Sequence, residues 1–201
     1  MSAHAPVLLD ETTALIAPGA DKTYVDATFG AGGYSRAWLE AARCTVWGID
    51  RDPEAVARGR ALEQASEGRF HMVEGPFSAI AELVPAQPVH GIAFDLGVSS
   101  PQIDTPERGF SFRLDGPLDM RMGRDGESAA DVVNGATEEE LEHIIRTLGE
   151  ERYARRIARA IVRARPIART LELAEIVRRA VPPAHDGIDP ATRTFQACAC
   201  T

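Results

Sequence analysis

The sequence has few cysteines, no long apolar run and no internal repeat. Its three cysteines, Cys44, Cys198 and Cys200, are too few for a disulfide framework, so we expect a reducing, cytoplasmic environment. No apolar stretch approaches the roughly 20 residues that cross a bilayer, and residues 1–10 lack the charged-then-apolar layout of a secretion signal. We therefore expect neither a disulfide-rich secreted protein nor a membrane partner.

The charge is distributed unevenly along the chain. Hydrophobic residues make up 44% and charged residues 26%, as in an ordinary globular protein, and the net charge of −8 would by itself argue against a nucleic-acid partner. Residues 1–145 carry a net −13, however, whereas residues 146–179, with ten arginines and four glutamates, carry +6. This segment can bind phosphate groups, or it can be a solvated helix face with Glu–Arg pairs, and the charge leaves both interpretations open.

The first half of the chain alternates between strand-like and helix-like stretches. Strands are predicted at residues 23–28, 45–49, 70–73 and 89–94. Asp10 and Asp52 are candidate helix N-caps, Pro53 suits a first helical turn, and a short helix is expected around Ile80 and Leu83. This alternation with short turns predicts an α/β fold with a doubly wound parallel sheet.

The second half has a different character. Residues 97–126 are rich in Gly, Pro, Ser, Asp and Arg, which predicts a long structured loop, and loops of this length are usually functional. From 129 to 181 the apolar residues follow helical spacing. We predict three parts: an α/β domain over 1–126, an inserted helical domain over 127–189, and the start of a return to the α/β domain over 190–201.

A glycine-rich turn follows the first predicted strand. Asp26 precedes Gly30, Gly32 and Gly33, and such glycines let the backbone approach a nucleotide-like ligand. The third glycine of a dinucleotide fingerprint is absent, which disfavours a nicotinamide dehydrogenase and fits an S-adenosylmethionine site better. Tight strand–helix turns also use glycine without any ligand, so the turn alone does not decide.

Three further residues are candidates because they follow strand ends. Asp50 lies where a carboxylate accepts both ribose hydroxyls, or it caps the next helix, although Asp52 is better placed for that. Phe77 can lie against an adenine ring or pack in the core. Asp95 can contact the methionyl group of the cofactor or the target amine, or it can cap the following turn.

The sequence resembles the bacterial methyltransferases that modify the exocyclic N4 of a decoding-site cytidine in small-subunit ribosomal RNA. The most specific match is Asp-Leu-Gly-Val-Ser-Ser-Pro-Gln at residues 95–102. The other matching stretches are residues 4–9, 26–33, 48–53, 108–112, 115–122, 149–152 and 190–197.

The resemblance implies an S-adenosylmethionine-dependent methyltransferase whose partner is 16S ribosomal RNA within the small ribosomal subunit, and whose inserted helical domain helps to hold the RNA. It places cofactor contacts at Gly32, Gly33, Tyr34, Asp50, Phe77, Asp95 and Gln102. The family more often has histidine at position 34, so a backbone contact is expected there. We expect Phe110 or Phe112 to hold the target base. Neither a catalytic residue nor a metal site is assigned, and the sequence gives no oligomeric state.

The sequence departs from the family at Cys198-Ala199-Cys200-Thr201. Family members continue past this point, with Leu-Arg, an apolar residue and often His. One added base before codon 198 would let these codons encode Leu-Arg-Met-His. We interpret the ending as a frameshift that truncates a normal gene, with the two cysteines accidental rather than a metal pair. We therefore expect an incomplete methyltransferase fold; the alternative function is an inactive fragment that at most binds cofactor or RNA.

Overall fold

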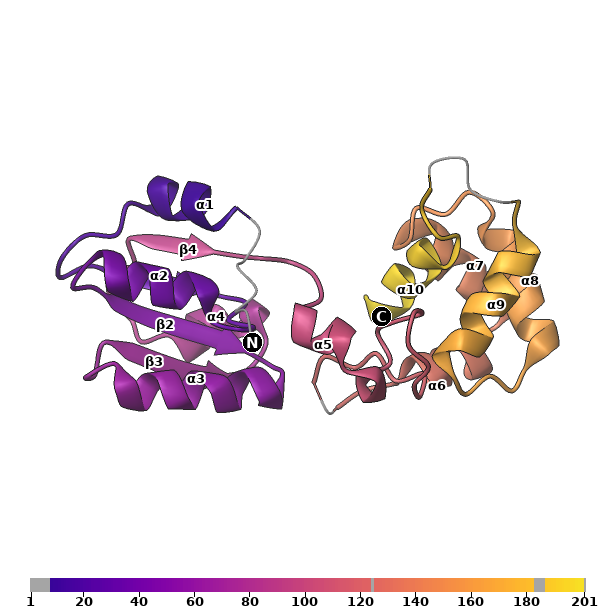
Figure 1. Ribbon diagram of the computed structural model, residues 1–201, viewed down its shortest axis with the longest axis horizontal. Coiled ribbons are helices and arrows are strands. Elements are labelled where there is room, and N and C mark those ends of the chain that lie inside the picture. The colour runs from indigo at the N-terminus through magenta and orange to yellow at the C-terminus, as the bar shows by residue number, and fades with distance from the viewer. Residues whose placement is uncertain (1–7, 124, 183–186, 201) are drawn as a thin grey trace. The chain divides into compact units, whose positions relative to one another are not determined.

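The computed structural model describes residues 8–123, 125–182 and 187–200. The chain divides into two compact units, Met1–Ser99 and Ser100–Thr201, which we call the α/β unit and the helical unit (Figure 1). Residues 4–7 of the first family-like stretch lie outside the described residues. The three-part division at 126 and 189 stays a prediction about the domains of the family.

The α/β unit contains a parallel four-stranded sheet in the order β3-β2-β1-β4. Its strands are β1 (Thr23–Asp26), β2 (Thr45–Asp50), β3 (Phe70–Glu74) and β4 (Gly91–Ala93). The chain runs outward from β1 to β3 and then returns to the other side of β1, which makes the β1–β4 boundary a topological switch point. The predicted parallel α/β sheet is therefore confirmed.

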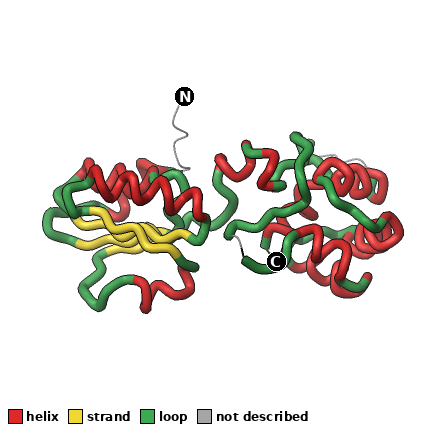
Figure 2. Tube along the Cα trace, turned by 90° about the horizontal axis from the view of Figure 1, so that it is seen from below, coloured by secondary structure: helices red, strands yellow, loops and turns green. Residues whose placement is uncertain are grey.

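The two faces of the sheet are covered differently (Figure 2). Helices α1 (Leu9–Ile16), α2 (Gly33–Ala41) and α3 (Pro53–Ala65) cover one face, over a core that includes Tyr24, Trp38 and Phe70. The other face carries a smaller cluster around Val25 and Ile49, packed against α4 (Ile80–Leu83), which follows η1 (Phe77–Ala79). Successive residues of β1 therefore belong to different cores, as strand alternation requires.

The two predicted N-caps have different outcomes. The Asp52 carboxylate accepts a hydrogen bond from Glu54 N at 3.0 Å and Pro53 opens α3, so this cap is confirmed. The prediction for Asp10 is wrong: α1 begins at Leu9, and its N-cap position makes no side-chain cap bond. Asp10 lies in the first turn instead, where its charge suits the positive end of the helix dipole.

The helical unit is built from short helices. They are α5 (Ser100–Asp104), η2 (Pro106–Arg108), α6 (Ala129–Gly135), α7 (Glu138–Thr147), α8 (Ala154–Ala164), α9 (Thr170–Ala180) and α10 (Ala191–Ala199), and those from α6 onward surround one apolar core. The helical prediction over 129–181 is confirmed as four helices. Among the described helices, none is both long and apolar enough to span a membrane.

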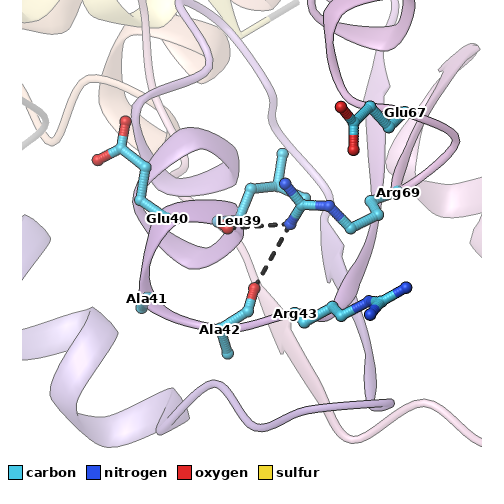
Figure 3. Close-up of a pocket in the computed structure, with 7 residues that line it drawn as sticks. All are labelled: Leu39, Glu40, Ala41, Ala42, Arg43, Glu67 and Arg69. Atoms are coloured by element: carbon cyan, nitrogen blue, oxygen red, sulfur yellow. Dashed lines mark hydrogen bonds between the residues drawn. The ribbon is translucent and has the colours of Figure 1, made fainter.

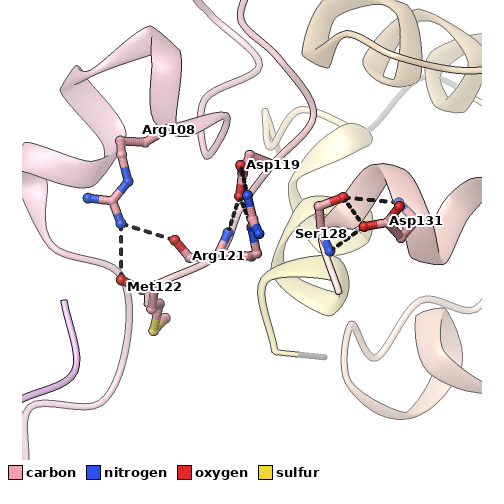
Figure 4. Close-up of polar contacts among 6 residues, drawn as sticks. All are labelled: Arg108, Asp119, Arg121, Met122, Ser128 and Asp131. Atoms are coloured by element: carbon pink, nitrogen blue, oxygen red, sulfur yellow. Dashed lines mark hydrogen bonds and ion pairs between the residues drawn. The ribbon is translucent and has the colours of Figure 1, made fainter. Parts of the chain in front are cut away.

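The predicted loop over 97–126 contains α5 and η2 and is otherwise held by polar contacts (Figure 4). Arg108 Nη2 donates to the carbonyl oxygens of Arg121 at 3.0 Å and Met122 at 3.1 Å. Arg121 in turn donates from two nitrogens to the Asp119 carboxylate, at 2.8 Å each. These bonds give an irregular segment a defined path without a strand or a long helix.

Helix α6 starts at a capping box. The Ser128 hydroxyl accepts from Asp131 N at 3.2 Å, while the Asp131 carboxylate accepts from Ser128 N at 2.9 Å (Figure 4). Thr137 and Glu140 repeat this arrangement at the start of α7. Two reciprocal caps in quick succession explain why the chain turns sharply after Gly135 and begins a new helix so soon.

Candidate cofactor site at the carboxyl ends of the strands

The α/β unit gathers acidic side chains at one edge of its sheet. Asp26 and Asp50 are the last residues of β1 and β2, and Asp95 follows β4 closely. Parallel strands place their carboxyl ends at the same edge, and ligands of open α/β sheets bind there, beside the switch point. The acidic residues that the sequence predicts for the site in the α/β unit therefore lie at the same edge of the sheet.

The glycine turn is shaped by steric contact as well as by backbone conformation. Gly30 and Gly32 have φ angles of +54° and +80°. A Cβ at Gly32 would lie 2.6 Å from the Phe29 ring, whereas a Cβ at Gly30 would meet nothing closer than Thr28 O at 3.8 Å. Gly32 is thus required by the turn itself, whereas a Cβ at Gly30 would make only ordinary van der Waals contacts. Gly33 follows as the first residue of α2.

Asp50 connects two turns through its side chain. Its Oδ2 accepts from Gly30 N at 2.8 Å and its Oδ1 accepts from Asp52 N at 2.9 Å. The alternative that Asp50 caps α3 is wrong, because the Asp52 side chain does so. A carboxylate oxygen can accept more than one hydrogen bond, so Asp50 retains capacity for two hydroxyl donors.

Asp26 supplies the cap that α2 lacks. The N-cap residue of α2 is Gly32, which has no side chain, and Asp26 Oδ2 instead accepts from Ser35 Oγ at 2.7 Å and Ser35 N at 3.3 Å. Asp26 is only 1% exposed, and this burial raises its pKa to about 6, opposed by the bonds from Ser35. A buried carboxylate therefore occupies the start of the helix that follows the glycine turn.

The two aromatic candidates lie in opposite environments. Tyr34 is buried, and its ring packs on Trp38 with 6.1 Å between centroids, so its backbone rather than its ring can face a ligand. Phe77 is 45% exposed and meets Phe94 edge to face at 5.7 Å. The alternative that Phe77 packs in the core is therefore wrong, and its ring is accessible to an adenine.

The remaining candidates divide between the two units. Asp95 is exposed, and its backbone N–H donates to Thr28 Oγ1 at 2.7 Å. Gln102 is a buried residue of α5 in the helical unit, and its cofactor contact stays a prediction. The expectation for Phe110 is wrong, because its ring belongs to the helical-unit core, and Phe112 packs edge to face on Phe195 at 5.2 Å.

Sequence reasoning missed three contributors to the site. Arg58 Nε in α3 donates to Gly30 O at 3.3 Å, Ser35 binds Asp26, and Phe94 packs on Phe77. A polar residue at the third position of a helix without an N-cap side chain is a usable signal for Ser35. Arg58 gives no such signal, because its reach back to the turn depends on how α3 packs.

A hollow at the opposite end of the sheet has no comparable chemistry (Figure 3). It is lined by Leu39, Glu40, Ala41, Ala42, Arg43, Glu67 and Arg69. Arg69 Nη1 donates to Leu39 O at 3.0 Å and Ala42 O at 3.5 Å, so its charge is used at the carboxyl end of α2. The hollow lies where β2 and β3 begin, away from Asp50.

The terminal cysteines are not arranged as a metal pair. Cys198 is buried in the core of the helical unit, where burial raises the pKa of its thiol to about 12, while Cys200 is exposed. The two thiols therefore lie in different environments, one inside the core and one at the surface. Across the described ranges, no three or more His, Cys, Asp or Glu side chains are grouped to hold a metal ion.

Comparison with known proteins gives close relatives. The MraW methylase family matches residues 1–200. The chain is 61% identical over 200 residues to the ribosomal RNA small subunit methyltransferase H of Paramagnetospirillum magneticum, covering 96% of this chain and 63% of that protein. Identity to the protein of that name from Rhodospirillum centenum is 58% over 202 residues, covering 98% and 61%. The chain thus spans less than two thirds of the length of these relatives.

Proposed function

The chain belongs to the MraW methylase family, and on this premise we propose that it acts in S-adenosylmethionine-dependent methylation of small-subunit ribosomal RNA, at the N4 amine of a cytidine. The observation that carries the proposal is the Asp50 carboxylate, which ends β2 and accepts from Gly30 N at 2.8 Å. The relatives' names support ribosomal RNA as the substrate.

The residues at the strand ends fit S-adenosylmethionine. Asp50 retains acceptor capacity for the two ribose hydroxyls, and the exposed ring of Phe77 offers a face for adenine. A pyrophosphate fits poorly, because the Asp26 carboxylate already binds the first turn of α2. The rival dehydrogenase is disfavoured on this ground as well as by the missing glycine.

The chemistry follows from what the site can position. S-adenosylmethionine supplies an electrophilic methyl group on a positively charged sulfonium. The carboxylates of Asp26, Asp50 and Asp95 make this edge of the sheet acidic, which favours a cationic ligand. Asp95 is exposed and can accept a hydrogen bond from an amine N–H, which would help the nitrogen direct its lone pair. Methyl transfer then depends chiefly on alignment of the two reactants.

The test separates cofactor binding from methyl transfer. Calorimetry of the 201-residue chain with S-adenosylmethionine should give saturable binding, and Asp50→Ala should weaken it. Transfer of a labelled methyl group to unmethylated small ribosomal subunits, with the product nucleoside identified by mass, tests the substrate. Absence of binding would overturn the cofactor proposal. Binding without transfer would instead support the alternative of an inactive fragment.

A further inference from the structure

The ten arginines of residues 146–179 separate into two groups. Six of them are engaged within the protein. Arg146, Arg159, Arg169, Arg178 and Arg179 pair with carboxylates, and Arg165 donates to the carbonyl oxygens of Val133 and Ala136. The other four, Arg152, Arg155, Arg156 and Arg163, have no carboxylate partner within the described part of the chain. The engaged arginines therefore fit a solvated face with ion pairs, whereas the other four fit the interpretation that the segment binds phosphate groups.

The four unpaired arginines lie at or on helix α8. Arg155, Arg156 and Arg163 are exposed on α8, where helical spacing places them along one stripe, and Arg152 is exposed immediately before the helix. The opposite stripe of α8, with Ile157 and Ile161, is fully buried. We call Arg152, Arg155, Arg156 and Arg163 the α8 arginine face.

This clustering of positive charges destabilises the folded protein when no anion is bound. Arg152, Arg155 and Arg156 gather at the amino end of α8, where the helix dipole is positive and the first turn contains no acidic residue. The neighbouring carboxylate, Glu151, is turned inward, accepting from Tyr153 N at 2.7 Å and lying 4.0 Å from Arg193. A bound anion would relieve the repulsion among these arginines.

Tyr153 orients two of these arginines. The Cζ atoms of Arg152 and Arg156 lie 4.7 Å and 5.8 Å from the centroid of its half-buried ring. A guanidinium that rests on an aromatic ring uses its flat face, so its in-plane N–H donors stay available for phosphate oxygens. The ring also restricts the side-chain rotamers, which lowers the entropy lost when the arginines bind.

We propose that the α8 arginine face binds the phosphate backbone of ribosomal RNA, with Tyr153 as a positioning residue. The choice of RNA rests on the proposed function, while the charge pattern specifies where a polyanion can bind. Because residues 1–145 carry a net −13, an RNA strand is repelled by much of the chain and attracted to this face.

The test compares two triple variants of equal net charge. The first, Arg152→Ala with Arg155→Ala and Arg156→Ala, removes most of the face; the matched control, Arg146→Ala with Arg169→Ala and Arg179→Ala, removes three exposed but paired arginines. The probe is a fluorescent single-stranded oligoribonucleotide carrying the sequence around the target cytidine. Its affinity is measured by anisotropy over a series of salt concentrations.

The face variant should bind at least about tenfold more weakly at low salt. Its plot of log affinity against log salt should be shallower by about 2, at about 0.7 for each lost phosphate contact on a single strand. The control should keep nearly the full slope. Tyr153→Leu should weaken binding several-fold and Tyr153→Phe should restore it, because only the ring is needed.

The outcomes separate this inference from the function on which it rests. If the unmodified chain shows no salt-dependent RNA binding, the RNA substrate and the α8 arginine face both fail. If it binds and the two triple variants lose affinity equally, only the α8 arginine face fails. Cofactor binding and cooperative melting should be unchanged in the face variant; should it unfold, the single variants Arg155→Ala and Arg163→Ala carry the same test.

Discussion

The side chain of Asp50 holds the backbone N–H of Gly30 at 2.8 Å, across 20 residues of chain. Its second oxygen holds Asp52 N at 2.9 Å, so one carboxylate fixes the glycine turn and the start of α3 together. A group that already organises its surroundings meets a ligand without further ordering, and this lowers the entropic cost of binding.

This dual role leads to the first prediction. Asp50→Ala should weaken S-adenosylmethionine binding by about 1.5–3 kcal/mol, the usual effect of losing hydrogen bonds to a charged acceptor. Asp50→Asn serves as the partner variant, because it retains one acceptor for Gly30 N. Its affinity for S-adenosylmethionine should fall between those of the unmodified protein and Asp50→Ala. Titration calorimetry gives the dissociation constants, and an unchanged value for Asp50→Ala would remove this residue from the site.

The glycine turn allows a test with an internal control. Gly32→Ala places a Cβ 2.6 Å from the Phe29 ring at a φ of +80°, and should destabilise folding by about 3 kcal/mol. Gly68 has a similar φ of +76° with nothing within 4 Å of a Cβ, so Gly68→Ala should cost only about 1 kcal/mol. Urea unfolding measures both. Equal losses would show that the contact with Phe29 is unimportant.

Asp26 gives a prediction for pH. Because burial raises its pKa from 3.8 to about 6, its contribution to stability is fully present below about pH 4 and is lost as the pH rises through 6. Relative to Asp26→Asn, the unmodified protein should lose about 3 kcal/mol over this range. Ser35→Ala removes a hydrogen bond that lowers this pKa, so the variant should go on losing stability to a higher pH than the unmodified protein. If the free energy of unfolding changed with pH in the same way in all three proteins, the effect of burial on Asp26 would be contradicted.

Phe77 is predicted to matter for binding and not for folding. Since its ring is 45% exposed, Phe77→Ala should leave the melting temperature nearly unchanged, while S-adenosylmethionine affinity falls by about 1 kcal/mol through lost stacking. Phe94→Ala, which removes the ring that packs edge to face on Phe77, should have a smaller effect on affinity. Calorimetry and thermal melting on the same samples distinguish the two roles, and an unaltered affinity in Phe77→Ala would exclude the adenine contact.

The sheet and the location of its polar edge were predictable because they depend on local patterns. The alternation of apolar stretches and the cap at Asp52 with Pro53 are signals within a few residues, and both are confirmed. The fourth strand was predicted too long. At its start, Thr23 N donates to the ring nitrogen Nδ1 of His90 at 3.2 Å rather than to the backbone of β4, and at its end Asp95 N donates to Thr28 Oγ1 at 2.7 Å, so the ladder is short on both sides.

The positions of the aromatic rings could not be read from the sequence. Phe77 and Phe110 both follow glycine- and proline-rich turns, yet one is 45% exposed and the other 8%. The difference comes from tertiary packing: Phe110 belongs to the helical-unit core together with Leu118 and Met120, whereas Phe77 lies outside the described cores and packs edge to face on the exposed Phe94. Likewise, charge identified the basic segment, but only the ion pairs show which arginines are already used.

The two outer strands of the sheet, β3 and β4, differ in whether their outer backbone groups are available to pair with another strand. On β3, the Glu63 carboxylate accepts from Met72 N at 3.1 Å, so a side chain of α3 occupies a donor that a fifth strand would need. Ile92 of β4 and Phe94, the residue that follows this strand, are 44% and 49% exposed, and no described strand pairs with the outer side of β4. We therefore expect a strand added to this sheet, from whatever chain, to join beside β4, and a charged substitution such as Ile92→Lys should disfavour pairing at that edge.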